Sequence, residues 1–382
     1  MSPSGQVDLS VIIVNYNVAS LVLQAVASLE RQKFAGPNGR DGRLEILVID
    51  NASSPEDVAC LKGLPPSVIL LRNEQNLGFA AATNQGIERS SGRYLCFLNP
   101  DTKVLDGALE ILLQHLYQHP EVGAVGPRIW ADDERTLCFS PLEPPTLSFM
   151  LARLLGSGFP LVGPWHTRQW HRLVHGFWRS QMPVTVPMLS GACIVTSRMV
   201  VGRVGRFAPC YFLFYEDADW CRRVRRAGYR LVCVPGAEVI HYYHQSARQD
   251  PLVTRHHARG SRDRFVGIHY GRLGVMAYKA VEAIGGYMNR WWPPDTSQEI
   301  IDLGYRTEPP RLCVEGVASA CELMVQIGVN ECFIPSAAAF TRIAEFQISK
   351  EVWGRMPPGR YYAAIIDAEA LRSLAIWSWV KG

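Results

Sequence analysis

Four nearly continuous apolar runs, separated by mixed polar segments, occupy the first hundred positions of the chain. They cover residues 9–16 (LSVIIVNY), 44–51 (LEILVIDN), 68–73 (VILLRN) and 93–100 (RYLCFLNP). Short runs rich in Val, Ile and Leu are typical of β-strands. Because apolar residues do not alternate with polar ones, we expect these strands to lie in a sheet that is covered on both faces.

Helical periodicity characterises the segments between and after these runs. Apolar residues recur at helical spacing over 20–32, 76–90 and 109–120, and Ser20 is a candidate N-cap for the first segment. Alternating strands and helices predict a doubly wound α/β layer. Ligands of such layers bind at the carboxyl ends of the strands. Three strands end in polar residues, which we therefore expect along one edge: Asn15 and Asn17, Asp50, and Asn99 and Asp101.

The remainder of the chain changes character several times. Residues 137–187 are rich in Pro, Trp and Leu, and we expect an irregular insertion over one edge of the sheet. A helix is predicted from about Asp217 to Ala227, with Gly228 as its C-cap. Residues 261–293 predict an amphipathic helical segment. Strand-like stretches and the turn MPPGR then predict a small β-rich domain over 296–382, which leaves 1–295 as the first domain.

Composition and charge narrow the class of protein. The chain has 382 residues, of which 48% are hydrophobic and 19% charged, as in globular proteins. A net charge of +4 gives no support for nucleic-acid binding. The ten cysteines form no C-x-x-C pair and several lie in apolar runs, as reduced cysteines do. There is neither a signal-peptide pattern nor a run of about 18 apolar residues. We therefore expect a cytoplasmic protein, or one at the inner face of the membrane.

The candidate chemical residues are weak signals one at a time. Asp50 and Asp101 could each be a turn or cap residue at a strand end. Glu216, Asp217 and Asp219 could be the acidic first turn that any helix favours. A histidine such as His241 is most often structural, and His244 competes with it for any ligand role. Their order and context carry more information than any one of them.

Seven segments together resemble one known family. They read SVIIVNYN, ILVIDNAS, NLGFAAATNQGI, YLCFLNPDT, LSGACIVTSR, FYEDADWCRRVRRAGY and VPGAEVIHYYHQS, and they span roughly residues 8 to 270. The chain resembles the family 2 glycosyltransferases of the GT-A fold, in particular their bacterial rhamnosyltransferase-like and galactofuranosyltransferase-like branch. The resemblance implies a Rossmann-like nucleotide-diphospho-sugar transferase domain, with the C-terminal β-rich domain outside it.

The resemblance implies a nucleoside diphosphate sugar as donor and a divalent cation, Mg²⁺ or Mn²⁺, as cofactor. The D-x-D-like motif of the family is here Asn99-Pro100-Asp101, so Asp101 is expected to bind the metal, and His241 to complete its shell. Asp50 is expected to accept the imide N–H of a pyrimidine base. The other implied donor-binding residues are Asn15, Asn17, Asn76, Gly78, Phe79, Asn84 and Asn99.

The resemblance also implies an acceptor side. Asp217 matches the general base of the family, and a single base without a covalent intermediate gives inversion at the anomeric carbon. The implied acceptor-binding residues are Ser190, Gly191, Ala192, Glu216 and Asp219, and Glu216 and Asp219 could instead hold Arg222 and Arg223. The segments VTVPM and GRFAPCYF depart from the family pattern on this side. The resemblance therefore leaves the acceptor and the donor sugar open.

The expected function is an inverting, metal-dependent transfer of a sugar to a cell-surface polysaccharide or a lipid-linked precursor. dTDP-rhamnose is the donor that the resemblance favours. Two alternatives stay open: a non-catalytic nucleotide-sugar-binding or assembly protein, and a nucleotidyltransferase. The second would need a Gly-rich basic loop after the first strand, where NYNVAS has none. The segments 137–187 and 261–293 could either pack against the protein or contact a membrane surface.

Overall fold

The computed structural model describes residues 7–36, 39–156, 162–242, 251–291, 300–316 and 321–382. The chain divides into two compact units, each built from two separate stretches. The first unit comprises residues 1–129 and 180–275, and the second comprises 130–179 and 276–382. The sequence predicted one boundary at residue 295. The observed division differs because residues 130–179 group with the C-terminal region rather than with the N-terminal α/β layer.

The first unit contains the doubly wound α/β layer that the sequence predicted. Its strand order is β6-β9-β4-β1-β2-β3. The strands β1 to β4 run parallel, and β9 runs antiparallel to β4 and β6. The bounds are β1 Leu9–Asn15, β2 Leu44–Asp50, β3 Ile69–Arg72, β4 Tyr94–Leu98, β6 Val122–Trp130 and β9 Cys193–Ser197.

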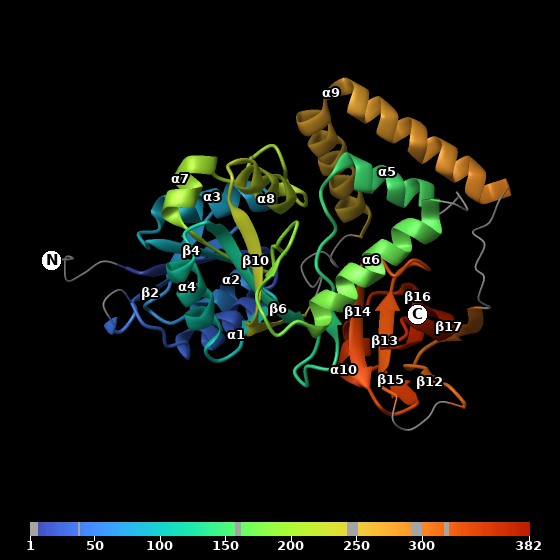
Figure 1. Ribbon diagram of the computed structural model, residues 1–382. Coiled ribbons are helices and arrows are strands. Elements are labelled where there is room, and N and C mark those ends of the chain that lie inside the picture. The colour runs from blue at the N-terminus through green and yellow to red at the C-terminus, as the bar shows by residue number, and fades with distance from the viewer. Residues whose placement is uncertain (1–6, 37–38, 157–161, 243–250, 292–299, 317–320) are drawn as a thin grey trace. The chain divides into compact units, whose positions relative to one another are not determined.

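Helices cover this sheet on both faces, which explains why its strands are apolar without alternation. Figure 1 shows α3, α7 and α8 along one side of the sheet and α1 on the other. Along β1, Val11 and Ile13 join the core cluster that also contains residues of α1 and α4. Ile12 points the opposite way, where a Cβ added at Gly86 of α3 would lie 2.4 Å from it. The helix bounds are α1 Ala19–Glu30, α2 Pro55–Cys60, α3 Phe79–Arg89, α4 Ala108–Gln118, α7 Arg198–Val204 and α8 Glu216–Arg226, with a 3₁₀ turn η2 at Leu61–Gly63.

Two expectations about helix caps differ from the structure in detail. The first helix begins at Ala19, and Ser20 is not its cap, because Val18 occupies the N-cap position without a side-chain bond. Asp57 of α2 supplies the missing acceptor, since its Oδ1 accepts the Ala19 N–H at 2.8 Å. The predicted C-cap glycine lies one residue after the observed cap Ala227, with φ +92°.

The first unit also contains a long strand and the part of a long helix up to Val275. Strand β10 (Arg230–His241) pairs antiparallel with β5 (Thr102–Val104) and β8 (Val184–Thr185). Helix α9 (Pro251–Trp291) is interrupted at Gly271, where φ is +68°. It includes the described part of the predicted amphipathic segment 261–293 and begins ten residues earlier. Residues 292–293 and His244 lie outside the described residues.

The second unit is rich in β-structure, as predicted for the C-terminal region. Its strand order is β11-β17-β16-β13-β14-β7, and only β11 and β17 are a parallel pair in the part of this sheet that is described. A separate ladder joins β12 and β15. The bounds are β7 Cys138–Phe139, β11 Ile300–Arg306, β12 Arg311–Cys313, β13 Leu323–Gly328, β14 Ser336–Thr341, β15 Glu345–Gln347, β16 Gly359–Asp367, β17 Arg372–Lys381 and α10 Lys350–Arg355.

The prediction of an irregular insertion at 137–187 was wrong. The segment contains α5 (Leu147–Gly156) and α6 (Val162–Arg179). Trp170, Val174 and Phe177 are buried at helical spacing along α6. The prolines misled the interpretation, because Pro164 lies in the first turn of α6, where a helix tolerates proline. Among the described residues, no helix has both the length and the apolar character needed to cross a membrane.

Candidate active site

The carboxyl ends of β1 and β2 lie side by side, as expected. Asn15 is paired with Asp50 in the parallel register, and both are fully buried. The Asn15 Nδ2 donates to Asp50 Oδ1 at 3.0 Å and lies 2.7 Å from Asp57 Oδ2. Asn17, at φ +56°, uses its side-chain oxygen to accept the Ser54 N–H at 2.7 Å. Both asparagines therefore organise the loop that follows β1, and direct contact with a donor stays a prediction for them.

Asp50 retains one oxygen with unused accepting capacity. Its Oδ2 is buried without a hydrogen bond among the described residues, and the Arg72 Nε lies 3.5 Å away. Burying a carboxylate oxygen without a donor is costly, so such an atom is usually reserved for a ligand or held by a charge. This is compatible with the predicted contact to a pyrimidine imide.

The loop before α3 is held by amide side chains. Asn51 donates to Asn76 Oδ1 at 2.8 Å, and the same oxygen accepts the Gly78 N–H at 2.9 Å. Gly78 has φ +82°, and a Cβ there would lie 2.5 Å from the carbonyl oxygen of Phe212. Phe79 donates its N–H to that carbonyl at 2.8 Å. Asn76, Gly78 and Phe79 thus form a close approach between the start of α3 and the segment around 212. Asn51 follows the second predicted strand directly, but the sequence reasoning assigned it no role in the site.

Asn84 has a different task from the predicted one. Its Nδ2 donates to the Phe207 carbonyl at 2.8 Å, and its Oδ1 accepts the Phe207 N–H at 3.1 Å. The amide thereby pairs with the backbone as a strand would. In this structure Asn84 fixes α3 to the segment after α7, and a donor-facing role is left as a prediction.

Asp101 and His241 lie together although they are 140 residues apart in the chain. Strand β10 places His241 opposite Thr102 in the antiparallel register with β5. The His241 Nε2 lies 3.1 Å from Asp101 Oδ1 and 3.4 Å from the Asn99 Nδ2. Both side chains are largely buried, with exposed fractions of 10% and 5%. The two residues that the sequence assigned to one metal site therefore lie within hydrogen-bond distance of each other, and metal binding by them stays a prediction.

This pair fits a divalent cation as a partial ligand set. A carboxylate oxygen and an imidazole nitrogen that converge within hydrogen-bond distance are a donor set suited to Mn²⁺. No group of three or more His, Cys, Asp or Glu side chains with metal-binding geometry occurs in the part of the chain that is described. A cation held here would therefore need oxygen ligands from a bound molecule, as Mg²⁺ and Mn²⁺ sites at phosphates commonly have.

The loop Ser190–Ala192 lies between the Asn99–Thr102 segment and the carboxylate of Asp217. On one side, the Ala192 carbonyl accepts the Asn99 N–H at 3.0 Å and the Thr102 hydroxyl at 3.3 Å. On the other side, the Gly191 N–H donates to Asp217 Oδ2 at 3.3 Å. Gly191 leaves little room here, because a Cβ would lie 3.2 Å from that oxygen. The loop thus contacts both Asp217 and the Asn99–Thr102 segment that contains Asp101.

Asp217 has the electrostatics of a proton acceptor. It occupies the first turn of α8, where its Oδ1 also lies 2.8 Å from the Ala218 N–H. Burial raises the pKa of Asp217 to about 6, and the backbone N–H groups of Ala218 and Gly191 act in the opposite direction. Burial, followed by the Asp217 carboxylate, raises the pKa of Glu216 well above its ordinary value. Ionisation of one of these two neighbouring carboxyl groups therefore disfavours ionisation of the other.

Asp219 forms ion pairs within the protein. Its Oδ2 accepts from Arg223 Nε at 2.8 Å, which confirms the predicted contact with one of the two arginines. Its Oδ1 lies 2.8 Å from the Nε2 of His269, a residue of α9 that the sequence reasoning did not single out. No motif marks His269, because the contact depends on α9 folding back onto α8. Acceptor binding by Asp219 and by Ser190 stays a prediction.

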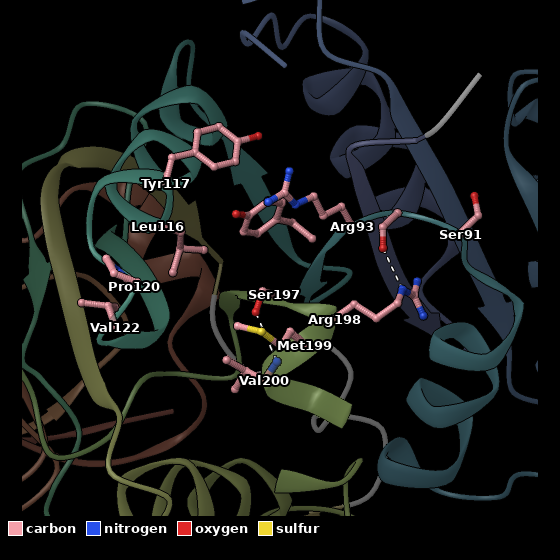
Figure 2. A pocket seen from close by; sticks show the side chains of 12 residues that line it. Ser91, Arg93, Leu116, Tyr117, Pro120, Val122, Ser197, Arg198, Met199 and Val200 are labelled. Atoms are coloured by element: carbon pink, nitrogen blue, oxygen red, sulfur yellow. Dashed lines mark hydrogen bonds between the residues drawn. The ribbon is translucent and has the colours of Figure 1, made fainter. Parts of the chain in front are cut away.

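One surface cavity of the first unit lies away from these residues. It measures about 590 Å³ and is lined at the start of β4 by Arg93 and Tyr94, at the end of α4 by Tyr117, and at the start of α7 by Met199. Figure 2 shows Leu116 and Tyr117 opposite Ser197 and Val200. Within the lining, residues 91–93 precede β4 and residues 198–200 follow β9, which runs antiparallel to β4, so the cavity lies at the amino end of β4. Asp101 follows the carboxyl end of that strand, and we do not assign the donor to this cavity.

Comparison with known proteins gives one family match and several relatives. A family model described as "Glycosyl transferase family 2" matches residues 10–204. An N-acetylglucosaminyl-diphospho-decaprenol L-rhamnosyltransferase of Mycobacterium tuberculosis is 30% identical over 227 residues, which are 56% of this chain and 72% of that protein. The O-antigen biosynthesis protein RfbC of Myxococcus xanthus is 25% identical over 214 residues, which are 54% of this chain and 15% of that protein.

Solved structures give more distant likenesses. The mannosyltransferase PcManGT from Pyrobaculum calidifontis, in complex with GDP-Man and Mn²⁺, has a TM-score of 0.43 and 17% identity over 75% of this chain and 76% of its own. GalNAc-T7 with UDP, GalNAc and Mn²⁺ has a TM-score of 0.44 and 16% identity, covering 62% of this chain and 44% of its own.

Proposed function

Because the chain belongs to glycosyl transferase family 2 and is a glycosyltransferase, we propose that it is inverting and metal-dependent and uses a nucleoside diphosphate sugar. The acceptor in this proposal is a hydroxyl of a surface glycan or its lipid-linked precursor. The GT-A fold expected from the sequence agrees with this membership and with the observed α/β layer of the first unit.

The three-residue loop Ser190–Ala192 is the observation that carries the proposal. Its Ala192 carbonyl accepts from the Asn99 N–H and the Thr102 hydroxyl, and its Gly191 N–H donates to Asp217. A transferase that works by single displacement needs a charge-stabilising group at the leaving diphosphate and a base at the attacking hydroxyl. A rigid connection between the two groups fixes their separation, and such orientation can supply about 7–11 kcal/mol of the barrier in well-oriented systems.

On the donor side, Asp50 and the start of α3 bind the nucleotide in this proposal. The Asp50 Oδ2, which has no hydrogen bond among the described residues, accepts the imide N–H of the base. The Gly78 and Phe79 N–H groups are engaged within the protein, so contacts from the start of α3 to the sugar or phosphate would come from the N–H groups that follow them. Asp101 and His241 would hold the cation. The cation supplies neutralisation of the negative charge that develops on the departing diphosphate.

On the acceptor side, Asp217 takes the proton. The acceptor oxygen forms a bond to the anomeric carbon while the bond from that carbon to the diphosphate oxygen breaks, and that electron pair leaves with the diphosphate. The hydroxyl proton passes to the Asp217 carboxylate. One displacement without an enzyme-bound sugar inverts the anomeric configuration. The nearby acid Glu216 remains protonated in this scheme, since burial and Asp217 both raise its pKa.

For the sugar and the acceptor, the mycobacterial relative guides the proposal. Its name specifies a rhamnosyl transfer to N-acetylglucosaminyl-diphospho-decaprenol, and we take dTDP-rhamnose and a lipid-linked acceptor as the first substrates to test. A lipid-linked acceptor would bring the enzyme to the inner face of the membrane. The exposed Leu273 and Met276 on α9 favour such contact; protein that stays in solution when acceptor-bearing phosphatidylglycerol vesicles are sedimented would count against it.

The proposal is tested with a panel of nucleotide sugars and either Mg²⁺ or Mn²⁺, with and without the lipid-linked acceptor. We expect release of the nucleoside diphosphate, fastest with dTDP-rhamnose, and a product whose anomeric configuration, read by NMR, is opposite to that of the donor. Retention of configuration would overturn the single-base mechanism. Release of pyrophosphate would instead indicate a nucleotidyltransferase, and no release with any donor would indicate a binding protein.

A further inference from the structure

The segment that leads into α8 has an unusual backbone. Phe214 and Tyr215 both have φ +66°, although neither is glycine. Side chains in the left-handed region cost about 1–3 kcal/mol each and persist only where the surroundings hold them. Helix α8 begins at the next residue, so this strained turn sets the direction in which Asp217 leaves the backbone.

The first part of α9 holds this turn from outside. The Ser261 hydroxyl donates to the Leu213 carbonyl at 2.8 Å. The fully buried Phe265 packs its ring against Tyr215, with ring centroids 5.4 Å apart. One helical turn further along α9, the ring of His269 packs against Phe265, with centroids 4.5 Å apart. These contacts place the imidazole over the first turn of α8.

His269 and Asp219 form a buried pair. The distance from His269 Nε2 to Asp219 Oδ1 is 2.8 Å, and the side chains are only 3% and 4% exposed. The second Asp219 oxygen accepts from Arg223, which also donates to the carbonyls of Val204 and Arg206. Asp219 is thus clamped between α9 on one side and the end of α7 on the other.

The partners of His269 indicate its tautomer. An Arg226 guanidinium nitrogen lies 3.4 Å from Nδ1, and an arginine can only donate. Nδ1 is then the acceptor and Nε2 carries the hydrogen that is donated to Asp219. Burial lowers the pKa of His269, which agrees with a neutral ring. The neutral ring has one donor and one acceptor, and each faces a partner of the opposite kind.

Asp219 follows Asp217 by two residues on α8. Since successive helical residues are about 100° apart, the two carboxylates project from nearly opposite sides of the helix. Asp217 can therefore face Gly191 while Asp219 faces α9. Any rotation or shift of the first turn of α8 would change both contacts together.

We propose that His269 is a positioning residue for the transfer step, which holds the first turn of α8 through Asp219 and so fixes the Asp217 carboxylate against the Gly191 loop. This inference rests on the proposed function, in which Asp217 is the base. It predicts that His269 affects the rate of transfer rather than the binding of the donor, because Asp50 and Asp101 belong to other elements.

The test compares three variants with the wild-type protein. His269→Ala removes the donor to Asp219. His269→Gln retains one, because the glutamine Nε2 can occupy a place similar to that of the imidazole Nε2. His256→Ala is the matched control, since it removes an exposed imidazole from the same helix. For each, we would measure kcat and KM with dTDP-rhamnose, and the affinity for dTDP with Mn²⁺ by calorimetry.

We expect His269→Ala to lower kcat by about 10- to 100-fold, the range expected for a small misplacement of a reacting group. KM for the donor and the affinity for dTDP should change by less than about twofold. His269→Gln should recover most of the lost kcat, and His256→Ala should behave as wild type. A full kcat in His269→Ala would overturn the inference. A loss of dTDP affinity equal to the loss of kcat, without recovery by glutamine, would also overturn it by showing a merely structural role.

Asp217→Asn, measured in parallel, separates this inference from the function it rests on. If Asp217→Asn keeps full transfer, the assignment of the base is wrong, whatever His269→Ala does. If Asp217→Asn abolishes transfer while His269→Ala keeps its kcat, the base assignment stands and only the positioning role of His269 fails.

Discussion

Three carboxylates of the first unit differ in the groups that they contact. Asp101 faces an imidazole, Asp219 faces an arginine and an imidazole, and Asp217 faces only backbone N–H groups among its described contacts. A carboxylate without a cationic partner in a largely buried site binds a proton more readily, which explains the direction of its pKa. The same acid residue type therefore performs different tasks according to its neighbours.

We expect the pH dependence of transfer to report the ionisation of Asp217. The base acts in its ionised form, and burial raises its pKa to about 6. The value of kcat/KM should therefore be level above that pH and fall by about tenfold per unit below it. A pH series from 4.5 to 8 with dTDP-rhamnose gives the profile, and dTDP affinity measured at each pH separates this effect from a loss of donor binding. A rate that stays level down to pH 4.5 would contradict the role of Asp217.

Sequence reasoning identified the acids but not all of their partners. Asp50, Asp101 and Asp217 follow strands or begin a helix, and such positions can be read from local pattern. His269, the partner of Asp219, comes from a segment 50 positions further along the chain, and nothing in its local sequence marks it. The two bonds between Asn84 and Phe207 also join residues 123 positions apart, so the pattern around Asn84 could not show that its amide was already engaged.

Helix starts and short loops, more than strands, bring the site together. The start of α3 meets the Phe212 carbonyl, and the loop Ser190–Ala192 meets both Asn99 and Asp217. Glycine is required where these backbones approach closely. The apolar runs predicted the four parallel strands to within two residues at each end, because burial on both faces leaves a strong signal. The insertion was misjudged, because proline at a helix start and proline in a loop look alike in composition.

Replacing Gly78 by alanine should weaken donor binding as well as the fold. The new Cβ would lie 2.5 Å from the Phe212 carbonyl, in addition to the cost of the positive φ. Gly107→Ala is the matched control, because Gly107 also precedes a helix, has φ +78° and has nothing within 4 Å of the added Cβ.

For the control, we expect a loss of about 1 kcal/mol in the free energy of unfolding, from backbone strain alone. Gly78→Ala should lose about 1–3 kcal/mol more and bind dTDP with Mn²⁺ at least tenfold more weakly. Urea denaturation and calorimetry measure the two quantities. Equal behaviour of the two variants in both experiments would show that the contact with Phe212 has no part in donor binding.

The chain crosses three times between its two compact units, after residues 129, 179 and 275. Residues 130–179 leave the first unit and join the C-terminal region, where β7 pairs with β14 across almost 200 positions. A boundary drawn along the sequence assumes that each domain is one continuous stretch, and that assumption fails here. The β-rich character of the C-terminal region was predictable from its strand-like stretches and turns. The sequence could not predict that α5 and α6 belong to the same unit, because contacts between distant segments leave no pattern in the local sequence.

The division of labour between Asp101 and Asp217 is tested most directly by calorimetry of dTDP binding, with and without Mn²⁺, alongside transfer assays. Wild type, Asp101→Ala and Asp217→Asn should be compared. Asp217→Asn is expected to fold at least as well as wild type at pH 8. In the wild-type protein, burial raises the pKa of the Asp217 carboxyl group, so its ionised form opposes folding above about pH 6. The asparagine of the variant removes that charge.

We predict that Asp101→Ala loses the Mn²⁺-dependent part of the dTDP affinity. Asp217→Asn should bind dTDP and Mn²⁺ as wild type does while its transfer rate falls by about 10²–10⁴-fold, the range for loss of a general base. Unchanged Mn²⁺-dependent affinity in Asp101→Ala, or an equal loss of binding and transfer in Asp217→Asn, would contradict the assignment of one acid to the leaving diphosphate and the other to the attacking hydroxyl.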